Sequence, residues 1–160
     1  MTAPATMSRR RALAVLLVTA ALVFALDHLV KWQVGAHLAL DQEVPAGGAV
    51  TIHLIHNRGA AFGLFQGAQL LFLGVAVLVS GYILLAGHRF AGGALTQVIL
   101  GLILGGSAAN AVDRVAQGYV IDYVDLHRWP VFNLADACIV VGILAAVLTF
   151  GRASASGHPS

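Results

Sequence analysis

Charged residues are scarce in this 160-residue sequence. Asp, Glu, Lys and Arg together make up 10% of it, and Lys31 is its single lysine. About a quarter of the residues in soluble domains are charged, whereas here 59% are hydrophobic and the mean hydropathy is +0.85. This composition excludes an ordinary water-soluble domain and indicates a membrane protein.

Cysteine is nearly absent as well. Cys138 is the only one, so the chain can form neither an intramolecular disulfide nor a cysteine metal cluster. A lone cysteine in an apolar stretch usually behaves as a small hydrophobic residue. His53 and His56 lie close together, but no further ligand has the spacing of a metal site, and we interpret them as solvated or hydrogen-bonded. The sequence predicts no metal and no other cofactor.

Long apolar stretches take the place of the missing charges. Each approaches or exceeds the roughly 20 residues that cross a membrane as a helix, and the backbone there must be hydrogen-bonded within the segment. The stretches lie at about residues 12–34, 64–87, 90–112 and 132–151. We therefore predict an all-α integral membrane protein with four transmembrane helices, forming one domain over residues 1–160 with a flexible tail at 153–160.

The first apolar stretch follows three arginines, Arg9–Arg11, a pattern that cleaved signal peptides share with membrane anchors. No small-residue cleavage site follows the stretch, because Leu26 leads directly into Asp27. We interpret it as a membrane anchor.

Basic residues indicate the orientation, because cytoplasmic loops are enriched in them. They precede the first stretch, join the second to the third at His88 and Arg89, and follow the fourth at Arg152. Both termini are therefore predicted to be cytoplasmic, and the connections at residues 35–63 and 113–131 to lie outside. The net charge of +2 comes mainly from these anchors, so it does not indicate a nucleic-acid partner.

The first outer connection contains a strand-like segment. Pro45–Gly48 is a turn signal, and residues 49–55 alternate β-branched with other side chains. We predict a small β-structure over residues 43–62 that rests on the outer membrane surface.

Four of the seven acids lie between Gly105 and Ile139, within a very apolar region. The predicted topology brings every acid of the chain to the outer face, which indicates a polar pocket there. Ionisable residues at the edge of a membrane are costly and tend to be functional. The polar residues gathered near this face are Asp27, Lys31, Asn110, Asp113, Arg114, Asp122, Asp125, Asn133 and Asp136.

Two pairs in this set have alternative interpretations. Asp27 and Lys31 are four residues apart, where opposite charges pair on a helix. They either form an interfacial ion pair with the lysine reaching to the surface, or contact a substrate headgroup. Asp113 and Arg114 end a predicted helix, where Arg114 either braces a loop or neutralises a carboxylate.

Asp136 lies one turn into the fourth stretch, where an unpaired carboxylate would cost several kcal/mol. A second carboxylate that shares one proton solves this problem, because two close carboxylates cannot both ionise. One of the two then acts as a general base on water, while the other polarises a carbonyl. Ser80 and Ser107 have no lysine near them, so the sequence favours an aspartic hydrolase.

Two other classes of function were weighed. A transporter or proton-coupled channel subunit would distribute its acids through the membrane depth, whereas these gather at one face. A scaffold protein would leave the convergence of the polar motifs unexplained.

At these residues the chain resembles the lipoprotein signal peptidase family, also called signal peptidase II. Five motifs carry the resemblance, in the family's order, and extend over most of the chain. They are DHLVK (Asp27–Lys31), HNRGAAF (His56–Phe62), GGSAANAVDR (Gly105–Arg114), GYVIDYVD (Gly118–Asp125) and PVFNLAD (Pro130–Asp136).

The resemblance implies four membrane helices, an outer β-cradle and an aspartic dyad at Asp122 and Asp136. It implies removal of the signal peptide from diacylglyceryl-modified prolipoproteins, just before the lipidated cysteine, and inhibition by globomycin. It also implies a monomer in contact with lipid, in the bacterial cytoplasmic membrane, with its active site at the outer face. The positions that match the family's supporting and substrate-contact residues are Asn57, Gly59, Asn110, Asp113, Arg114 and Asn133.

A few positions depart from the family pattern. His28 and Val30 stand where Gln or Arg and Thr or Ser are usual, Ala109 replaces a glycine, and Tyr123 replaces a phenylalanine. None of these changes removes a carboxylate, so they affect the expected packing and leave the expected chemistry intact.

Overall fold

The computed structural model of the protein describes residues 7–59, 69–90 and 93–155, with side chains up to residue 150. Helices dominate these ranges, and a small antiparallel sheet with the strand order β1-β2-β3 joins them. The elements are α1 (Arg9–His37), β1 (Glu43–Val44), β2 (Thr51–Asn57), α2 (Gln69–Ala86), the 3-10 turn η2 (Gly87–Arg89), α3 (Gly93–Gln117), β3 (Val120–Asp125) and α4 (Leu134–Ala155).

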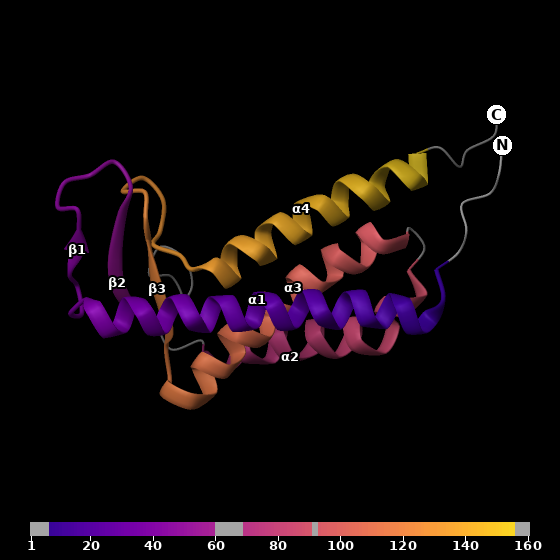
Figure 1. Ribbon diagram of the computed structural model, residues 1–160, viewed down its shortest axis with the longest axis horizontal. Coiled ribbons are helices and arrows are strands. Elements are labelled where there is room, and N and C mark those ends of the chain that lie inside the picture. Colours follow the sequence, from indigo (N-terminus) through magenta and orange to yellow (C-terminus); the bar gives the residue numbers. More distant parts are fainter. Residues whose placement is uncertain (1–6, 60–68, 91–92, 156–160) are drawn as a thin grey trace.

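The sheet lies at one end of the helices (Figure 1). The first turn of α1 and the last turns of α4 lie at the opposite end, so the helices enter and leave the bundle on the side away from the sheet. Ser8 starts α1 as its N-cap, since its hydroxyl accepts a hydrogen bond from the Arg11 backbone N–H at 3.4 Å. Which side of the membrane each end of the bundle faces stays a prediction.

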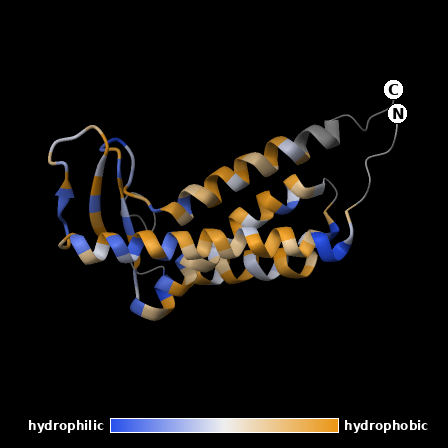
Figure 2. Cartoon of the chain, viewed as in Figure 1, coloured by the Kyte–Doolittle hydropathy of each residue, from blue (hydrophilic) through white to orange (hydrophobic). Residues whose placement is uncertain are grey.

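Three helices in the described part of the chain are long and apolar enough to cross a membrane: α1, α2 continued through η2, and α3. The apolar stretch of α4, Leu134–Phe150, is shorter, so a fourth crossing stays a prediction. Apolar residues make up most of the helices, many of them exposed, while polar residues are frequent in the sheet and in the first turn of α1 (Figure 2). A surface of this kind suits lipid, and the protein is a multi-pass membrane protein.

Several predicted bounds differ from the observed ones. α1 extends beyond residues 12–34 at both ends, and α3 continues past residue 112 to Gln117. A helix can continue past an apolar stretch where its polar side chains have polar partners, so hydropathy alone underestimates its length. The predicted start of the second span at residue 64 lies outside the described residues, as do residues 60–62 of the predicted β-structure.

The predicted small β-structure is present, and the sheet contains one strand more than predicted. β1 and β2 lie within the predicted β-structure, but β3 comes from the second outer connection and was not predicted. It pairs with β2 antiparallel, with Ile55 opposite Asp122 and Asn57 opposite Val120. A two-stranded ribbon alone is only marginally stable, and this third strand, which carries Asp122, completes the sheet.

Small residues let the other helices pack closely against α3. A Cβ atom added at Gly105 would lie 2.5 Å from the Ala20 carbonyl oxygen of α1, and one at Gly106 would collide with the Ala135 carbonyl of α4. Glycine is therefore required at both positions for close approach of the backbones. These two glycines let α1 and α4 pack closely against α3.

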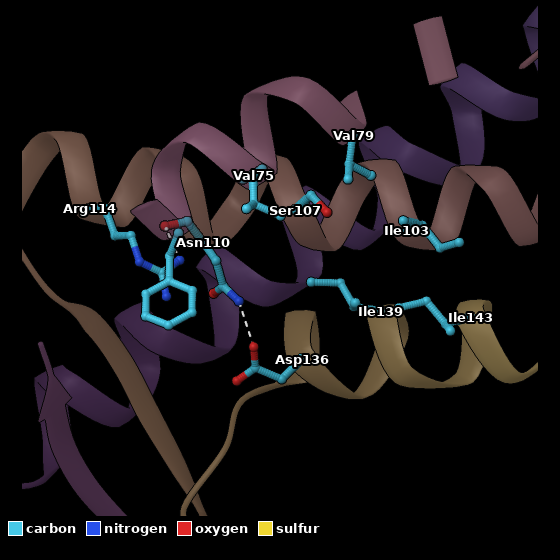
Figure 3. Close-up of a pocket in the computed structure, with 11 residues that line it drawn as sticks. Val75, Val79, Ile103, Ser107, Asn110, Arg114, Asp136, Ile139 and Ile143 are labelled. Carbon is cyan, nitrogen blue, oxygen red and sulfur yellow. Dashed lines mark hydrogen bonds between the residues drawn. The ribbon is translucent and has the colours of Figure 1, made fainter. Parts of the chain in front are cut away.

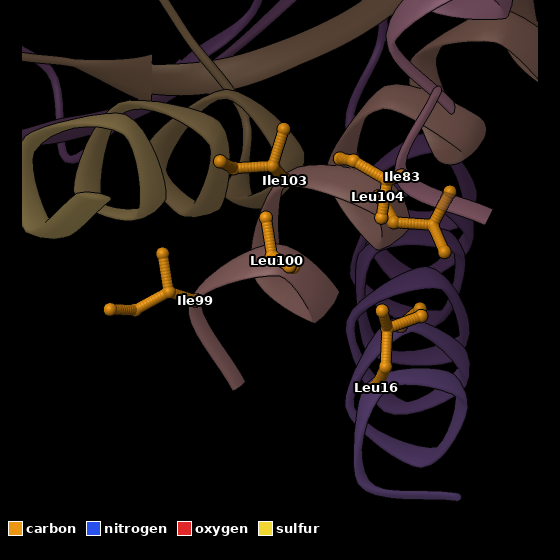
Figure 4. Packing of buried hydrophobic residues seen from close by; sticks show 7 residues of the cluster. Leu16, Ile83, Ile99, Leu100, Ile103 and Leu104 are labelled. Carbon is orange, nitrogen blue, oxygen red and sulfur yellow. The ribbon is translucent and has the colours of Figure 1, made fainter. Parts of the chain in front are cut away.

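Two apolar clusters complete the interior. The first lies between α1, α2 and α3 and consists of Leu16, Ala20, Ile83, Ile99, Leu100, Ile103 and Leu104 (Figure 4). The second joins the sheet to the last turns of α1 through Val34, Leu54 and Tyr123. This second cluster fixes β3 relative to the helices, and so sets where the side chains of β3 point.

Candidate active site

Asp122 of β3 and Asp136 of α4 line the same cavity. Its volume is about 300 Å³, and its walls include Asn57, Gly59 and Arg114. Asp122 is 1% exposed. The two carboxylates predicted to form a pair, which are 14 positions apart in the sequence, are therefore brought together by the sheet and by the start of α4.

Asn133 fixes Asp136 in the first turn of α4. The Asn133 side-chain oxygen accepts a hydrogen bond from the Asp136 backbone N–H at 2.8 Å, and Asp136 Oδ2 accepts one from the Asn133 backbone N–H at 3.4 Å. This reciprocal pattern is a capping box, which satisfies two backbone donors at a helix start. The sequence NLAD thus contributes to the orientation of the Asp136 carboxylate through local geometry.

Three side-chain amides donate to the two carboxylates. Asn57 Nδ2 lies 2.8 Å from Asp122 Oδ2, and Asn133 Nδ2 lies 2.7 Å from Asp122 Oδ1. Asn110 Nδ2 donates to Asp136 Oδ1 at 2.7 Å, as the dashed line in Figure 3 shows. Neutral donors of this kind hold carboxylates in one orientation without forming an ion pair with them.

The pKa of Asp122 is raised to about 7. Burial is the main cause, because it disfavours the charged form, and the neighbouring charge of Asp136 adds to it. Hydrogen bonds from Asn57 and Asn133 and the charge of Lys31 act in the opposite direction. The carboxyl group of Asp122 can therefore hold a proton near neutral pH beside a second acid.

Lys31 is buried in the middle of the polar cluster rather than at the surface. It is 2% exposed, and its Nζ lies 2.6 Å from Asp27 Oδ2, 2.7 Å from Asp113 Oδ2 and 3.1 Å from Asn110 Oδ1. The predicted Asp27–Lys31 ion pair is present. The prediction that the lysine reaches to the surface is wrong, because the carboxylate of Asp113 on α3 holds it inside. In this position a lipid headgroup does not reach the ammonium group.

The two acids paired with Lys31 also tie together the elements that carry the site. Asp27 Oδ1 accepts a hydrogen bond from the Ala135 backbone N–H at 2.9 Å, which joins α1 to the start of α4. Asp113 Oδ2 accepts one from the Ile121 backbone N–H at 3.5 Å, which joins α3 to β3. Asp27 and Asp113 thus act on the positions of Asp136 and Asp122.

Arg114 lies where two cavities meet. Its Nη1 donates to the Asn110 backbone oxygen at 3.3 Å, and its guanidinium group stands 5.5 Å from the centre of the Phe72 ring. The second cavity, of about 260 Å³, extends from Arg114 and Asp136 between α2, α3 and α4 (Figure 3). Its remaining lining is largely apolar, so a chain with an apolar end could lie there.

Other predicted residues have clear places. The Gly59 backbone N–H donates to Asn57 Oδ1 at 2.9 Å and so orients the Asn57 amide. Asp125, which was grouped with the other outer acids, lies apart from the cavity and bonds His53 instead. His53 is therefore hydrogen-bonded, as predicted.

Sequence reasoning missed part of the cavity wall. Trp129, Phe132 and Val140 line it together with the two acids. Sequence reasoning also predicted no partner for Tyr123, whose hydroxyl accepts a hydrogen bond from the Leu134 backbone N–H at 3.1 Å. The aromatic residues of the outer connection were the available signal, because large apolar residues in a loop next to acids often belong to a binding site.

The fold and the site define a class: a multi-pass membrane protein in which two acids, the buried Asp122 and the half-buried Asp136, line one cavity at the end of the helix bundle. The signal peptidase II family model matches residues 19–151, which is most of the chain. The chain belongs to the signal peptidase II family, and is thereby a peptidase.

Named relatives agree with this assignment, and a solved structure shows the same fold. The lipoprotein signal peptidase of Moorella thermoacetica is 42% identical over 80% of this chain and 87% of its own, and that of Halothermothrix orenii is 38% identical over 79% and 88%. A solved bacterial membrane enzyme has the same fold, with a TM-score of 0.81 at 20% identity, over 91% of this chain and 92% of that one.

Proposed function

We propose that the protein is an aspartic endopeptidase of the bacterial cytoplasmic membrane that removes the signal peptide from diacylglyceryl-modified prolipoproteins, cutting just before the lipidated cysteine. The observation that carries this proposal is the shared cavity of Asp122 and Asp136, each oriented by amide donors. The names of the relatives, lipoprotein signal peptidase, support the substrate class.

The pair supplies the two groups that peptide hydrolysis needs. One carboxylate takes a proton from water, and the oxygen of that water attacks the carbonyl carbon of the scissile bond. The other, protonated, donates to the carbonyl oxygen as charge develops on it. Collapse of the tetrahedral intermediate then breaks the C–N bond, and a proton passes to the leaving nitrogen. Cleavage yields the signal peptide with a new carboxylate and the lipoprotein with a free amino group on its cysteine.

The surroundings of the pair suit a substrate that lies partly in lipid. The second cavity, lined by Val75, Ile103 and Ile139 among others, leads from Asp136 into the apolar part of the bundle. A signal peptide or a lipid chain bound there would leave the scissile bond beside the two acids. In this proposal the protein works as a monomer in contact with membrane lipid, with α4 as its fourth crossing.

A cleavage assay tests the proposal directly. The purified protein in detergent should convert a lipidated prolipoprotein to its shorter form on a gel, and globomycin should block the conversion. The same prolipoprotein without its diacylglyceryl group is the matched control and should stay uncut. Cleavage of both forms at equal rates would contradict the proposed substrate class.

The pH profile of cleavage should fall on its alkaline side with a midpoint near 7. The pKa of Asp122 is about 7, so at higher pH the pair loses the single proton that it shares, and with it the general acid. Asn57 donates to the ionised form of Asp122 and lowers its pKa. Asn57→Ala should therefore move this limb to higher pH, whatever it does to the maximum rate. A limb that moved to lower pH would contradict the assignment.

Reporter fusions should place the sheet outside the cell. A reporter inserted near Gly47 should be exterior, and one fused after Arg89 should be cytoplasmic, because the basic residues mark the cytoplasmic ends. Lipidated prolipoproteins present their cysteine at the outer leaflet, so the pair has to lie at that face. A cytoplasmic reporter at Gly47 in the native protein would rule out this function.

A further inference from the structure

A second cluster of titratable side chains lies on the sheet, outside the cavity that contains the two acids. It consists of Glu43 on β1, His53 on β2, Asp125 at the end of β3 and His127 in the connection that follows. The hydrolysis mechanism uses none of these four groups. We call residues 126–132 the wall loop, since part of it lines the cavity.

Asp125 is the centre of this cluster. It is 8% exposed, its Oδ2 lies 3.0 Å from His53 Nδ1, and its Oδ1 accepts a hydrogen bond from the His127 backbone N–H at 2.6 Å. The hydrogen bond from His53 and then that from His127 lower the pKa of Asp125. The carboxylate therefore stays ionised, and both imidazoles face a fixed negative charge.

The His127 ring joins the wall loop to the turn between β1 and β2. Its Nε2 lies 2.7 Å from the Gly48 carbonyl oxygen and 3.5 Å from Glu43 Oε1. A carbonyl oxygen can only accept, so Nε2 carries a proton. The other ring nitrogen, Nδ1, lies 3.6 Å from Asp125 Oδ1. In the neutral ring Nδ1 would turn a lone pair toward that carboxylate, whereas in the charged ring it turns an N–H toward it.

The wall loop is fixed at its far end by backbone hydrogen bonds. The Phe132 N–H donates to the Val124 oxygen at 3.1 Å, and the Val124 N–H donates to the Phe132 oxygen at 2.8 Å. Between these bonds and His127 lie Trp129, Pro130 and Val131, which line the cavity beside Asp122 and Asp136. The Val124–Phe132 pair closes the loop at its base, and His127 additionally ties the loop to the turn between β1 and β2. Loss of the His127 contact would therefore release that attachment and leave the base paired.

We propose that Asp125, His53 and His127 form a positioning cluster that holds the wall loop in place, and that protonation of His127 tightens its hold on the cavity. Glu43 is a further charged group that faces the His127 ring. The coupling between pH and the position of the wall loop involves only residues of the sheet and of this loop, so it can be tested without a substrate. Its effect on substrate binding rests on the proposed function.

Fluorescence of Trp129 tests the coupling without substrate. The chain has two tryptophans, so Trp32→Phe leaves Trp129 as the only one, and acrylamide quenching in detergent then reports on the wall loop. We expect quenching to increase from pH 5 to pH 8 as the His127 imidazole loses its proton. In His127→Asn, whose side chain tolerates the positive φ of 57°, quenching should be high at both pH values.

His37→Gln is the matched control, because the His37 ring bonds the Gln33 carbonyl of its own helix and lies outside the cluster. It should keep the pH dependence of the Trp32→Phe background. If His127→Asn and Asp125→Asn also kept that dependence, the proposed coupling would be overturned.

Cleavage kinetics test the effect on the cavity. Asp125→Asn and His127→Asn should raise KM roughly tenfold, the equivalent of one charge-assisted hydrogen bond, and leave kcat nearly unchanged because the two acids keep their partners. His127→Gln should recover part of the loss, since its amide can donate to Gly48, but KM should no longer depend on pH. A lower kcat at unchanged KM would overturn the positioning role. Absence of cleavage in the wild type would instead refute the proposed function and leave the quenching result standing.

Discussion

Asp122→Asn and Asp136→Asn are each expected to lower the rate of cleavage by roughly four orders of magnitude, because members of one catalytic unit fail together. An amide keeps the shape of the carboxyl group and can still bond Asn57, Asn133 or Asn110. It can neither take a proton from water nor share one. The loss should therefore appear in kcat, while the protein inserts in the membrane and melts as the wild type does.

Two controls separate this result from a general effect. Asp41→Asn makes the same chemical change at an exposed position with a positive φ of 63°, which asparagine tolerates, and should cleave normally. Cys138→Ala should also be close to neutral, and a thiol-blocking reagent should not inhibit. Near-wild-type turnover in either dyad variant would mean that the pair is wrongly assigned, and Asp113 would be the next acid to test.

Lys31→Met is expected to destabilise the protein by about 3–5 kcal/mol, the usual cost of removing one partner from a buried ion pair. The ammonium group lies between the carboxylates of Asp27 and Asp113 and also bonds Asn110. Its loss removes the ammonium group that lies between these two buried carboxylates, and Asn110 Oδ1 keeps only the hydrogen bond from Asn133. Thermal unfolding in detergent should show the loss of stability, and cleavage should fall with it.

A second substitution distinguishes charge from packing in this variant. Lys31→Met/Asp113→Asn has one stranded carboxylate fewer and should recover part of the lost stability, while the amide oxygen can still accept from Ile121. Arg10→Met removes an exposed cation from the same helix and should melt like the wild type. Equal stability of Lys31→Met and the wild type would show that the buried cluster does not hold the helices together.

The polar residues of the proposed site could be singled out from the sequence because such residues are rare in it. In a chain with 10% charged residues, each acid near a membrane needs a partner or a function, and Asp136 in an apolar stretch indicated both. Asn133 was placed beside Asp136 by the predicted topology and by the family resemblance, whereas its role as the cap of α4 was found only in the structure. Which acid meets Asp136 was implied only by the family resemblance.

The partner of Lys31 could not be predicted in the same way. Its spacing from Asp27 indicated an ion pair, but the choice between surface and interior depends on Asp113, which is 82 positions away. Similarly, VIDYVD was considered for its acids, and its pairing with β2 was missed, because a strand is stabilised by neighbours that lie far away in the sequence. Local sequence patterns predict which face of a helix or strand is buried, but they do not predict which segment packs against that face.

The sequence by itself determined that this is a membrane protein, that its acids gather toward one end, and which family it resembles, because hydropathy, rare charges and short motifs are local properties. The tertiary structure decided that Lys31 is buried, that β3 completes the sheet, and that Asp125 lies apart from the other acids and is hydrogen-bonded to His53. It also brought Asp122 and Asp136 into one cavity. Each of these features depends on close contact between segments that are far apart in the chain, and packing sets such contacts. Glycines on α3 allow α1 and α4 to approach it closely, and the sheet lies at one end of these helices.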